Sequence, residues 1–404
     1  MIFFWQPLDR LSRRTGMARK QRPKITEEKL QGFKYFKILG PLLESLHTVG
    51  TQRDKARNRQ LHFDQYGALL LLYFFNPILT SLRGIQQASH LEKVQKKLGC
   101  RGTSLGSLSE AASVFDAQHL EEIIAELAAR IPQQTLSRDQ QALKNLTAVD
   151  GSLLPALSKM AWALWLDDEH RAGKMHVAFE VFRGIPIKVT VTEGNGNEKH
   201  ELRGMLEPDR LYVIDRGYAE YQLFQDILDR GSSFIGRIKN NAVWTVVEER
   251  PVSAKAKAAG VRRDLVVRLG GGKSGAVLKQ PLRIVEVETG KINSRGEPEI
   301  LLLVTDRMDL DAELVALGYR FRWSVELFFR WLKCILGCRH LLSHSQNGVT
   351  IQVYLAIIAS LLISLWTGRK PTKRTFEMIC FYFSGMASEE ELLAHIGKLK
   401  LQDA

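Results

Sequence analysis

The chain has 404 residues, 45% of them hydrophobic, which is enough for two or three domains with ordinary globular cores and excludes a disordered tail. Its 57 Lys and Arg residues against 44 Asp and Glu give a formal net charge of +13. Cationic side chains displace condensed counterions from phosphates, so this excess favours nucleic acid as a partner, with a membrane surface second.

The cysteines and the start of the chain bear on its compartment. Four cysteines show no paired CxxC spacing, which favours reduced thiols over a disulfide framework or a zinc site. The opening apolar run is too short for a signal peptide, and its charges follow that run instead of preceding it. We therefore expect a cytoplasmic protein.

Residues 1–138 are expected to form a helical, basic domain. Basic clusters lie at 10–24 and 53–59, and an apolar pattern of helical period lies at 120–131. These clusters either hold DNA or form the solvated surface of a helical bundle. From them we predict an N-terminal DNA-binding domain.

Two strongly apolar runs, at 67–75 and 353–366, raise the question of a membrane. Both are shorter than the roughly 18 to 20 residues that a membrane-spanning helix requires. We expect buried helices at both places and no association with a membrane.

Short β-type runs begin near residue 145 and alternate with helical stretches. Their order is strand, strand, strand, helix, strand, helix, which predicts a mixed sheet covered by helices. The predicted strands span 146–154, 174–182, 185–192 and 211–215, and the predicted helices span 197–206 and 219–231.

A second β-rich stretch with glycine-rich and polar turns follows at 240–298, and it is interpreted as an insertion. A buried-strand pattern resumes at 299–306, and helical residues follow it. The predicted division after residue 138 is an α/β domain in two parts, 139–239 and 299–370, around the insertion, and a helical C-terminal segment, 371–404.

Two motifs are rejected as sites. GGGKSG at 270–275 resembles a phosphate-binding loop, but Val267 stands where the first glycine belongs, so a hairpin turn is predicted. His340 and His344 have a spacing that suits zinc, yet they lack the intervening Glu and lie in a polar segment rich in turn-forming residues.

Two aspartates end predicted strands. Asp150 closes LTAV and Asp215 closes LYVI. Ligand crevices of α/β sheets form at the carboxyl ends of strands, so both acids are candidates for one pocket. Either is also explained as a turn former or helix cap.

A third acid, Glu326, lies in the stretch YRFRWSVELFFRWLK at 319–333. On a helix of about 100° per residue this stretch is apolar over most of its circumference and carries one polar stripe. The stripe comprises Tyr319, Arg322, Glu326, Arg330 and Lys333. Ordinary ion pairs between residues four apart, about 0.2 to 0.5 kcal/mol each, explain part of it. They do not explain a tyrosine and several cations sharing the stripe with one acid.

Three carboxylates in one pocket suit phosphodiester cleavage. Two divalent ions about 3.5 to 4 Å apart serve the attacking water and the leaving oxygen of an in-line displacement. Mg²⁺ takes hard oxygen ligands and retains several waters, so Asp150, Asp215 and Glu326 are sufficient ligands. Cations on the same helix face are suited to hold phosphates.

At this point the sequence resembles a known family. Tyr319, Arg322, Glu326 and Lys333 have the spacing Y-x2-R-x3-E-x6-K of bacterial insertion-sequence transposases of the insertion-sequence-four type. AVDGS, KMHVAFEV, VTEGNGNEKHE, VIDRGYAEYQLF, FIGRIK and LGCRHLLSHSQNGVTIQVYLAIIASLL are further resembling blocks, so the likeness covers about residues 145 to 365.

The resemblance implies an α/β fold, with a ribonuclease H-like mixed sheet flanked by helices, a β-rich insertion and a helical N-terminal domain. It implies that Asp150, Asp215 and Glu326 are catalytic and hold two Mg²⁺ ions, with Mn²⁺ as a substitute. Arg322 and Lys333 would then bind DNA phosphates, and Tyr319 would hydrogen-bond there. Arg330 shares their helix face as a further DNA-binding candidate.

The resemblance also implies double-stranded DNA partners, namely terminal inverted repeats and target DNA, and a homodimer on DNA at the bacterial nucleoid. Some relatives use a hairpin intermediate and stack an insertion-domain Trp on a flipped base, for which Trp244 is the candidate here. A core role for Trp244 is the alternative. Two other functions remain: a ribonuclease H-like nuclease without joining activity, and an inactive DNA-binding descendant of a transposase.

Overall fold

The computed structural model describes residues 40–47, 49, 60–132, 135–156, 158–167, 170–270, 278–292, 296–337 and 340–401. The basic clusters at 10–24 and 53–59 lie outside these ranges, as do Cys338 and all but the first residue of the glycine-rich turn at 270–275. DNA binding by the two clusters and the hairpin at 270–275 remain predictions.

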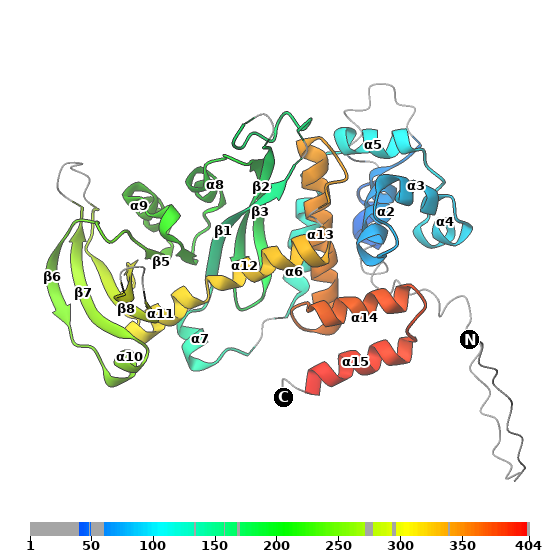
Figure 1. Ribbon diagram of the computed structural model, residues 1–404. Coiled ribbons are helices and arrows are strands. Elements are labelled where there is room, and N and C mark those ends of the chain that lie inside the picture. The colour runs from blue at the N-terminus through cyan, green and yellow to red at the C-terminus, as the bar shows by residue number, and fades with distance from the viewer. Residues whose placement is uncertain are drawn as a thin grey trace, which may run out of the picture.

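The centre of the protein is a mixed sheet whose first four strands and the two helices among them follow the predicted order of strand, strand, strand, helix, strand, helix, and a fifth strand comes next (Figure 1). Strands β1, β4 and β5 are parallel to one another, and β2 pairs antiparallel with both β1 and β3. This arrangement confirms the expected α/β fold with a ribonuclease H-like sheet. The strands are β1 (Leu146–Pro155), β2 (Ala172–Glu180), β3 (Ile185–Glu193), β4 (Leu211–Ile214) and β5 (Ser233–Arg237).

The β-rich segment predicted as an insertion extends this sheet instead of forming a separate layer. The strand order is β3-β2-β1-β4-β5-β9-β8-β7-β6, and each strand after β5 pairs antiparallel with its neighbour. The strand that resumes after the insertion therefore joins both halves. These strands are β6 (Trp244–Arg250), β7 (Val261–Leu269), β8 (Leu282–Ile292) and β9 (Pro298–Thr305).

Helices cover both faces of the first half of the sheet, because successive strand residues point to opposite faces. Val149 of β1 packs into a core that contains residues of α8 (Glu198–Met205) and α9 (Tyr221–Asp229). Ala148 packs into the larger core on the opposite face. That core contains residues of α11 (Ala312–Arg320), α12 (Trp323–Arg330) and α13 (Gln346–Thr367) (Figure 1).

The remaining helices lie before and after this layer. Residues of α2 and α6 line the same core as α13. The N-terminal helices therefore pack against the half of the sheet formed by β1 to β5 mainly through that helix. The helices are α2 (Phe63–Phe75), α3 (Leu82–Ser89), α4 (Glu92–Leu98), α5 (Leu105–Val114), α6 (His119–Arg130), α7 (Arg138–Ala142), α10 (Ala254–Ala258), α14 (Lys373–Phe383) and α15 (Glu389–Leu401).

Helix α13 is longer than the apolar run that predicted it. It has 22 residues, and among the described helices it alone is long and apolar enough to cross a membrane. The argument from run length was therefore wrong for this helix. However, 89% of its most apolar window is buried inside the protein, and its Gln352 is held by the backbone of Leu342 and His340. These features are those of a core helix.

The stretch 319–333, expected to form one helix, is divided in three. Helix α11 ends at Arg320, α12 begins at Trp323, and a π-helical turn, η2 (Trp331–Ile335), follows. The junction has hydrogen bonds three residues apart, such as Arg322 N to Tyr319 O at 3.1 Å. In the wider π turn the Lys333 ammonium donates to a carbonyl of β1, a contact that spacing along one helix does not predict.

Candidate active site

Asp150 projects from β1 toward α12. It lies two residues after Ala148, so the alternation of the strand places it on the face that α12 covers. The backbone N–H of Gly151 donates to Asp150 Oδ1 at 2.8 Å, and a guanidinium nitrogen of Arg322 lies 3.6 Å from Oδ2. The side chain is 22% exposed.

The pKa of Asp150 is raised to about 6, mainly because burial disfavours its charged form. The Gly151 N–H and Arg322 oppose this rise, while the negative charges of Asp215 and Glu198 add to it. The pKa of Asp150 is closer to neutral pH than that of an ordinary aspartate, as is common for acids at functional sites. A cation beside Asp150 would favour its ionised form.

Asp215 follows β4 at the same edge of the sheet. The parallel register pairs Ala148 with Val213, and two further residues along both strands bring Asp150 and Asp215 side by side. Adjacent strands lie about 4.8 Å apart. Asp215 also accepts the Gly217 N–H at 2.6 Å as the N-cap of η1 (Arg216–Tyr218), so its capping role and its place in the cluster coexist.

Glu326 reaches this cluster through Arg322. The guanidinium of Arg322 donates to Glu326 Oε1 at 2.7 Å and lies 3.6 Å from Asp150 Oδ2. The i, i+4 pair considered from the sequence therefore exists, but the same arginine also spans from α12 to β1. Arg330 is exposed and forms no ion pair with another described residue.

The three predicted acids have the oxygen donors that a divalent ion needs, but their positions also matter. Hard carboxylate oxygens from β1, the end of β4 and α12 are the ligands that Mg²⁺ and Mn²⁺ prefer. Among the described residues, however, no three His, Cys, Asp or Glu side chains are close enough to hold one ion as they stand. The three carboxylates are ligands of the right type for a divalent ion. However, Arg322 lies between Glu326 and Asp150, and it holds the Glu326 carboxylate in an ion pair.

Two more cations and a tyrosine surround the cluster. Burial raises the pKa of Tyr319, with the charges of Arg322 and Arg237 opposing the rise. Lys333 Nζ donates to the Leu153 carbonyl of β1 at 2.9 Å. Arg237, the last residue of β5, was not predicted as a site residue. The signal that could have identified it is its position at the end of a strand that neighbours β4. Its Nε is buried without a hydrogen-bond partner among the described residues.

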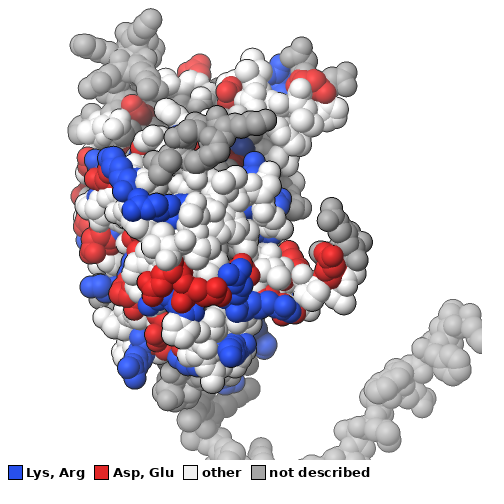
Figure 2. Space-filling view, turned by 90° about the vertical axis from the view of Figure 1, so that its left-hand side faces the viewer, with Lys and Arg blue, Asp and Glu red and all other residues white. Residues whose placement is uncertain are grey.

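Trp244 is not brought to this cluster. It begins β6, and four strands lie between β6 and β4. Its side chain is partly buried against the second core. Figure 2 shows both acidic and basic side chains on the side of the molecule where β6 and β7 lie. The exposed ion pair of Arg263 on β7 with Glu249 on β6, at 3.1 Å, is one example of such pairing in this part of the sheet.

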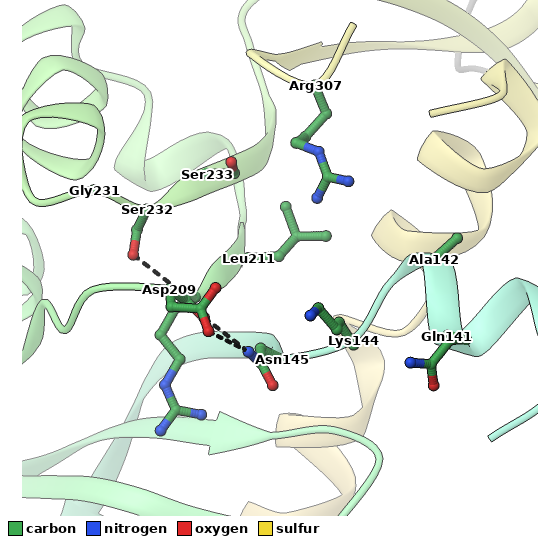
Figure 3. A pocket seen from close by; sticks show the side chains of 11 residues that line it. Gln141, Ala142, Lys144, Asn145, Asp209, Leu211, Gly231, Ser232, Ser233 and Arg307 are labelled. Atoms are coloured by element: carbon green, nitrogen blue, oxygen red, sulfur yellow. Dashed lines mark hydrogen bonds between the residues drawn. The ribbon is translucent and has the colours of Figure 1, made fainter. Parts of the chain in front are cut away.

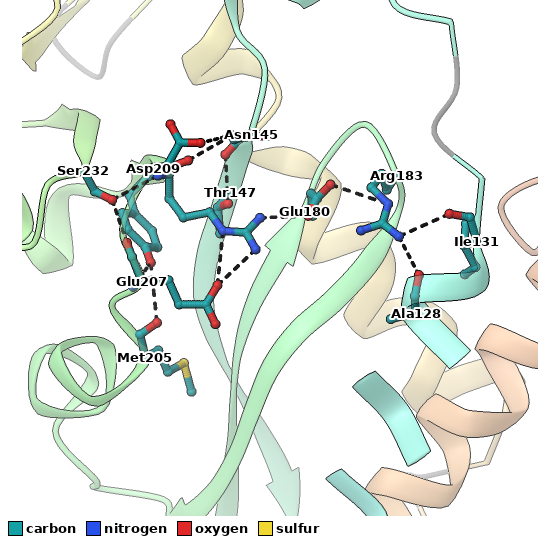
Figure 4. Close-up of polar contacts among 12 residues, drawn as sticks. Ala128, Ile131, Asn145, Thr147, Glu180, Arg183, Met205, Glu207, Asp209 and Ser232 are labelled. Carbon is teal, nitrogen blue, oxygen red and sulfur yellow. Dashed lines mark hydrogen bonds and ion pairs between the residues drawn. The ribbon is translucent and has the colours of Figure 1, made fainter. Parts of the chain in front are cut away.

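Two cavities lie at the opposite ends of β1 and β4 from the aspartates. One, of about 270 Å³, contains Lys144 and Arg307 (Figure 3), and the other, of about 540 Å³, adjoins it. The loops before the two strands are tied together here by Asn145 Nδ2, which donates to the Asp209 carbonyl at 2.9 Å (Figure 4). Both residues have positive φ angles, 60° and 56°. This end holds the strand starts in register and contains none of the predicted catalytic acids.

Comparisons with known proteins agree with the geometry. The family described as Transposase DDE domain matches residues 141–362. A putative transposase of Sinorhizobium fredii is 30% identical over 241 residues, which span 59% of this chain and 65% of the relative, just under two thirds of its length. A probable transposase for insertion sequence element IS5377 of Geobacillus stearothermophilus is 23% identical over 78% of this chain and 82% of its own.

Two further comparisons are more distant. A putative transposase for insertion sequence element IS4SA of Synechocystis is 23% identical over 69% of this chain and 77% of the relative. A solved piggyBac transposase synaptic complex with hairpin DNA has 10% identity and a TM-score of 0.43, over 91% of this chain and 83% of that one. The family match covers more than half of the chain and includes all three predicted acids. The chain belongs to the DDE transposases, a family of enzymes that act on DNA, as its resemblance to transposases of bacterial insertion sequences indicated.

Proposed function

We propose that the protein cleaves DNA at the ends of an insertion sequence and joins the freed 3′ ends to target DNA. One observation carries this proposal: the aspartates of two adjacent parallel strands meet beside a helix whose Arg322 contacts both Asp150 and Glu326. The alternatives of a nuclease that does not join and of an inactive descendant are outcomes of the test below.

Asp150, Asp215 and Glu326 are proposed to hold the divalent metal, with Mg²⁺ as the physiological ion, Mn²⁺ as a substitute, and two ions per site. When bound, such ions activate water and stabilise the leaving oxygen of a phosphodiester. Arg322 links Glu326 to Asp150 without DNA, and a phosphate is a competing partner for its guanidinium. Its transfer to DNA would release the Glu326 carboxylate toward the two aspartates.

The proposed partners are terminal inverted repeats and target DNA, bound by a homodimer in the cytoplasm at the nucleoid. Tyr319, Arg322, Lys333 and Arg330 are proposed to contact the strand being cut, and residues 1–138 to bind the repeat. Trp244 would reach a flipped base only if the partner protomer or bent DNA brings that base to β6, because it lies apart from its own cluster.

The test uses DNA flanking the coding region as substrate. End DNA with an intact repeat should be cut in Mg²⁺, and a pre-cleaved 3′ end should be joined to a plasmid. Cutting without joining would identify a nuclease, and binding without either reaction would identify an inactive descendant. Scrambled repeat DNA is the control for recognition.

A further inference from the structure

A fourth carboxylate, Glu198, lies beside the two aspartates on the other face of the sheet. It is the first residue of α8, whose N-cap Asn197 accepts the backbone N–H groups of Lys199 and His200. A Cβ added to Gly151 would lie 3.0 Å from Glu198 Oε1, and one added to Gly217 would lie 4.0 Å from Oε2. The absence of a side chain at Gly151 therefore leaves room for this carboxylate, and Gly217 lies within ordinary contact distance of it.

A buried hydroxyl faces the same place. Tyr218 is 1% exposed, and its Oη has no hydrogen-bond partner among the described residues. Burial raises the pKa of Tyr218, and the nearby negative charges of Glu198, Asp150 and Asp215 raise this pKa further. Leaving a buried hydroxyl unpaired is unfavourable, so the position of this hydroxyl suits a partner that arrives with a ligand.

A single lysine partly neutralises this acidic face. Lys174 Nζ lies 3.1 Å from Glu198 Oε1 and is 15% exposed. Its other described contact is a long hydrogen bond of 3.4 Å to the Gly196 carbonyl. The compact ammonium thus occupies a position beside the Glu198 carboxylate that a water bound to a metal ion would also favour.

We propose that Glu198 is a fourth carboxylate of the metal site, a positioning residue that holds water bound to the cation of Asp150 and Asp215, with Lys174 as its counter-ion in the metal-free protein. Tyr218 supplies the buried hydroxyl that completes this water network. Mg²⁺ and Mn²⁺ retain several waters, and groups that bind those waters typically change metal affinity by about 10- to 100-fold. The inference rests on the proposed function of the two aspartates.

A purely structural ion pair is the simpler explanation of Glu198 and Lys174, and it makes a different prediction. If the pair only fixes α8 to β2, removing either partner should have the same small effect on metal binding. If Glu198 serves the cation and Lys174 competes with it, the two substitutions should act in opposite directions.

The experiment measures Mn²⁺ binding to the full chain without DNA, by electron paramagnetic resonance of free Mn²⁺. Glu198→Gln should weaken binding at least 10-fold, whereas Lys174→Met should strengthen it. Glu201→Gln is the matched control: it removes the same charge from the same helix, where Glu201 accepts a hydrogen bond from Thr190 of β3 at 2.9 Å. It should bind Mn²⁺ like the unmodified protein.

The inference is overturned if Glu198→Gln binds Mn²⁺ as Glu201→Gln does, or if Lys174→Met weakens binding as much as Glu198→Gln. Asp150→Asn separates this failure from that of the proposed function, because unchanged binding in Asp150→Asn would refute the metal site itself. If Glu198→Gln does not fold, Glu198→Asp is the second variant. It keeps the negative charge but has a side chain shorter by one methylene. Unchanged affinity in that variant would equally refute the inference.

Discussion

The two halves of the sheet both bury charge, and they treat it in opposite ways. Between β7 and β8, Arg283 and Asp264 are 1% and 4% exposed and share two hydrogen bonds of 2.7 Å. The third guanidinium nitrogen of Arg283, Nη1, donates to the carbonyls of Arg307 and Leu310. Both charges of this pair are matched, as a buried ion pair requires if it is to be structural.

Around β1 and β4 the acids outnumber the cations that pair with them directly among the described residues. Asp150, Asp215, Glu198 and Glu326 share only Lys174 and Arg322 as direct ion-pair partners, and the Tyr218 hydroxyl is unpaired among the described residues. The pKa of Asp150 is raised mainly by burial, and the negative charges of Asp215 and Glu198 add to the rise. We propose that a ligand completes this partly buried cluster, which would distinguish the site from the matched pair in the same sheet.

The largest expected effect tests the incomplete cluster. Asp150→Asn, Asp215→Asn and Glu326→Gln should each lower the rate of strand cleavage by about 10³-fold or more, because each removes a group proposed to act in the transition state. Binding to end DNA should stay nearly unchanged by gel shift. A variant that cuts at the unmodified rate in Mg²⁺ would remove its residue from the site.

The next effect concerns the matched pair. Arg283→Met should lower the free energy of unfolding by about 3 to 5 kcal/mol, because Asp264 would remain buried and charged without a partner. Urea titration followed by circular dichroism measures it. The double variant Arg283→Met, Asp264→Leu should recover much of the loss, and a single variant as stable as the original would show that the pair is not desolvated.

A smaller effect of the opposite sign should appear at Asp150. Its folded pKa of about 6 lies above the unfolded value, so the folded state binds the proton more tightly, and ionisation destabilises the metal-free protein above pH 6. Asp150→Asn should therefore stabilise the metal-free protein at pH 7 by an amount on the order of 2 to 3 kcal/mol. The gain should fade as the pH falls through 6 toward 4. A gain independent of pH would contradict this explanation.

The smallest expected effects concern the cations. Arg322→Ala and Lys333→Ala should each reduce the salt dependence of DNA binding by about one unit of log-log slope, as expected for one lost phosphate contact. Fluorescence anisotropy at several salt concentrations measures the slope. Arg330→Ala should reduce the slope in the same way, since Arg330 is exposed on the same helical segment and is also proposed to contact DNA. Unchanged slopes for Arg322 and Lys333 would favour a purely structural ion pair and hydrogen bond.

Local pattern determined much of this protein. The alternation and order of the apolar runs predicted strands β1 to β4 and the helices α8 and α9, and strand-end positions singled out Asp150 and Asp215. The spacing of Tyr319, Arg322, Glu326 and Lys333 identified the family. These signals are local, because strand pleat and helical repeat are set within a few residues.

Tertiary structure decided the rest. Only the sheet order shows that the β-rich segment continues the catalytic sheet and leaves Trp244 four strands from β4. Only packing directs Arg322 to Asp150 as well as Glu326, and brings Glu198 beside the two glycines that follow the aspartates. Pairing between distant strands and the approach of helices from opposite faces depend on contacts across the whole chain. No sequence period within a few residues encodes them.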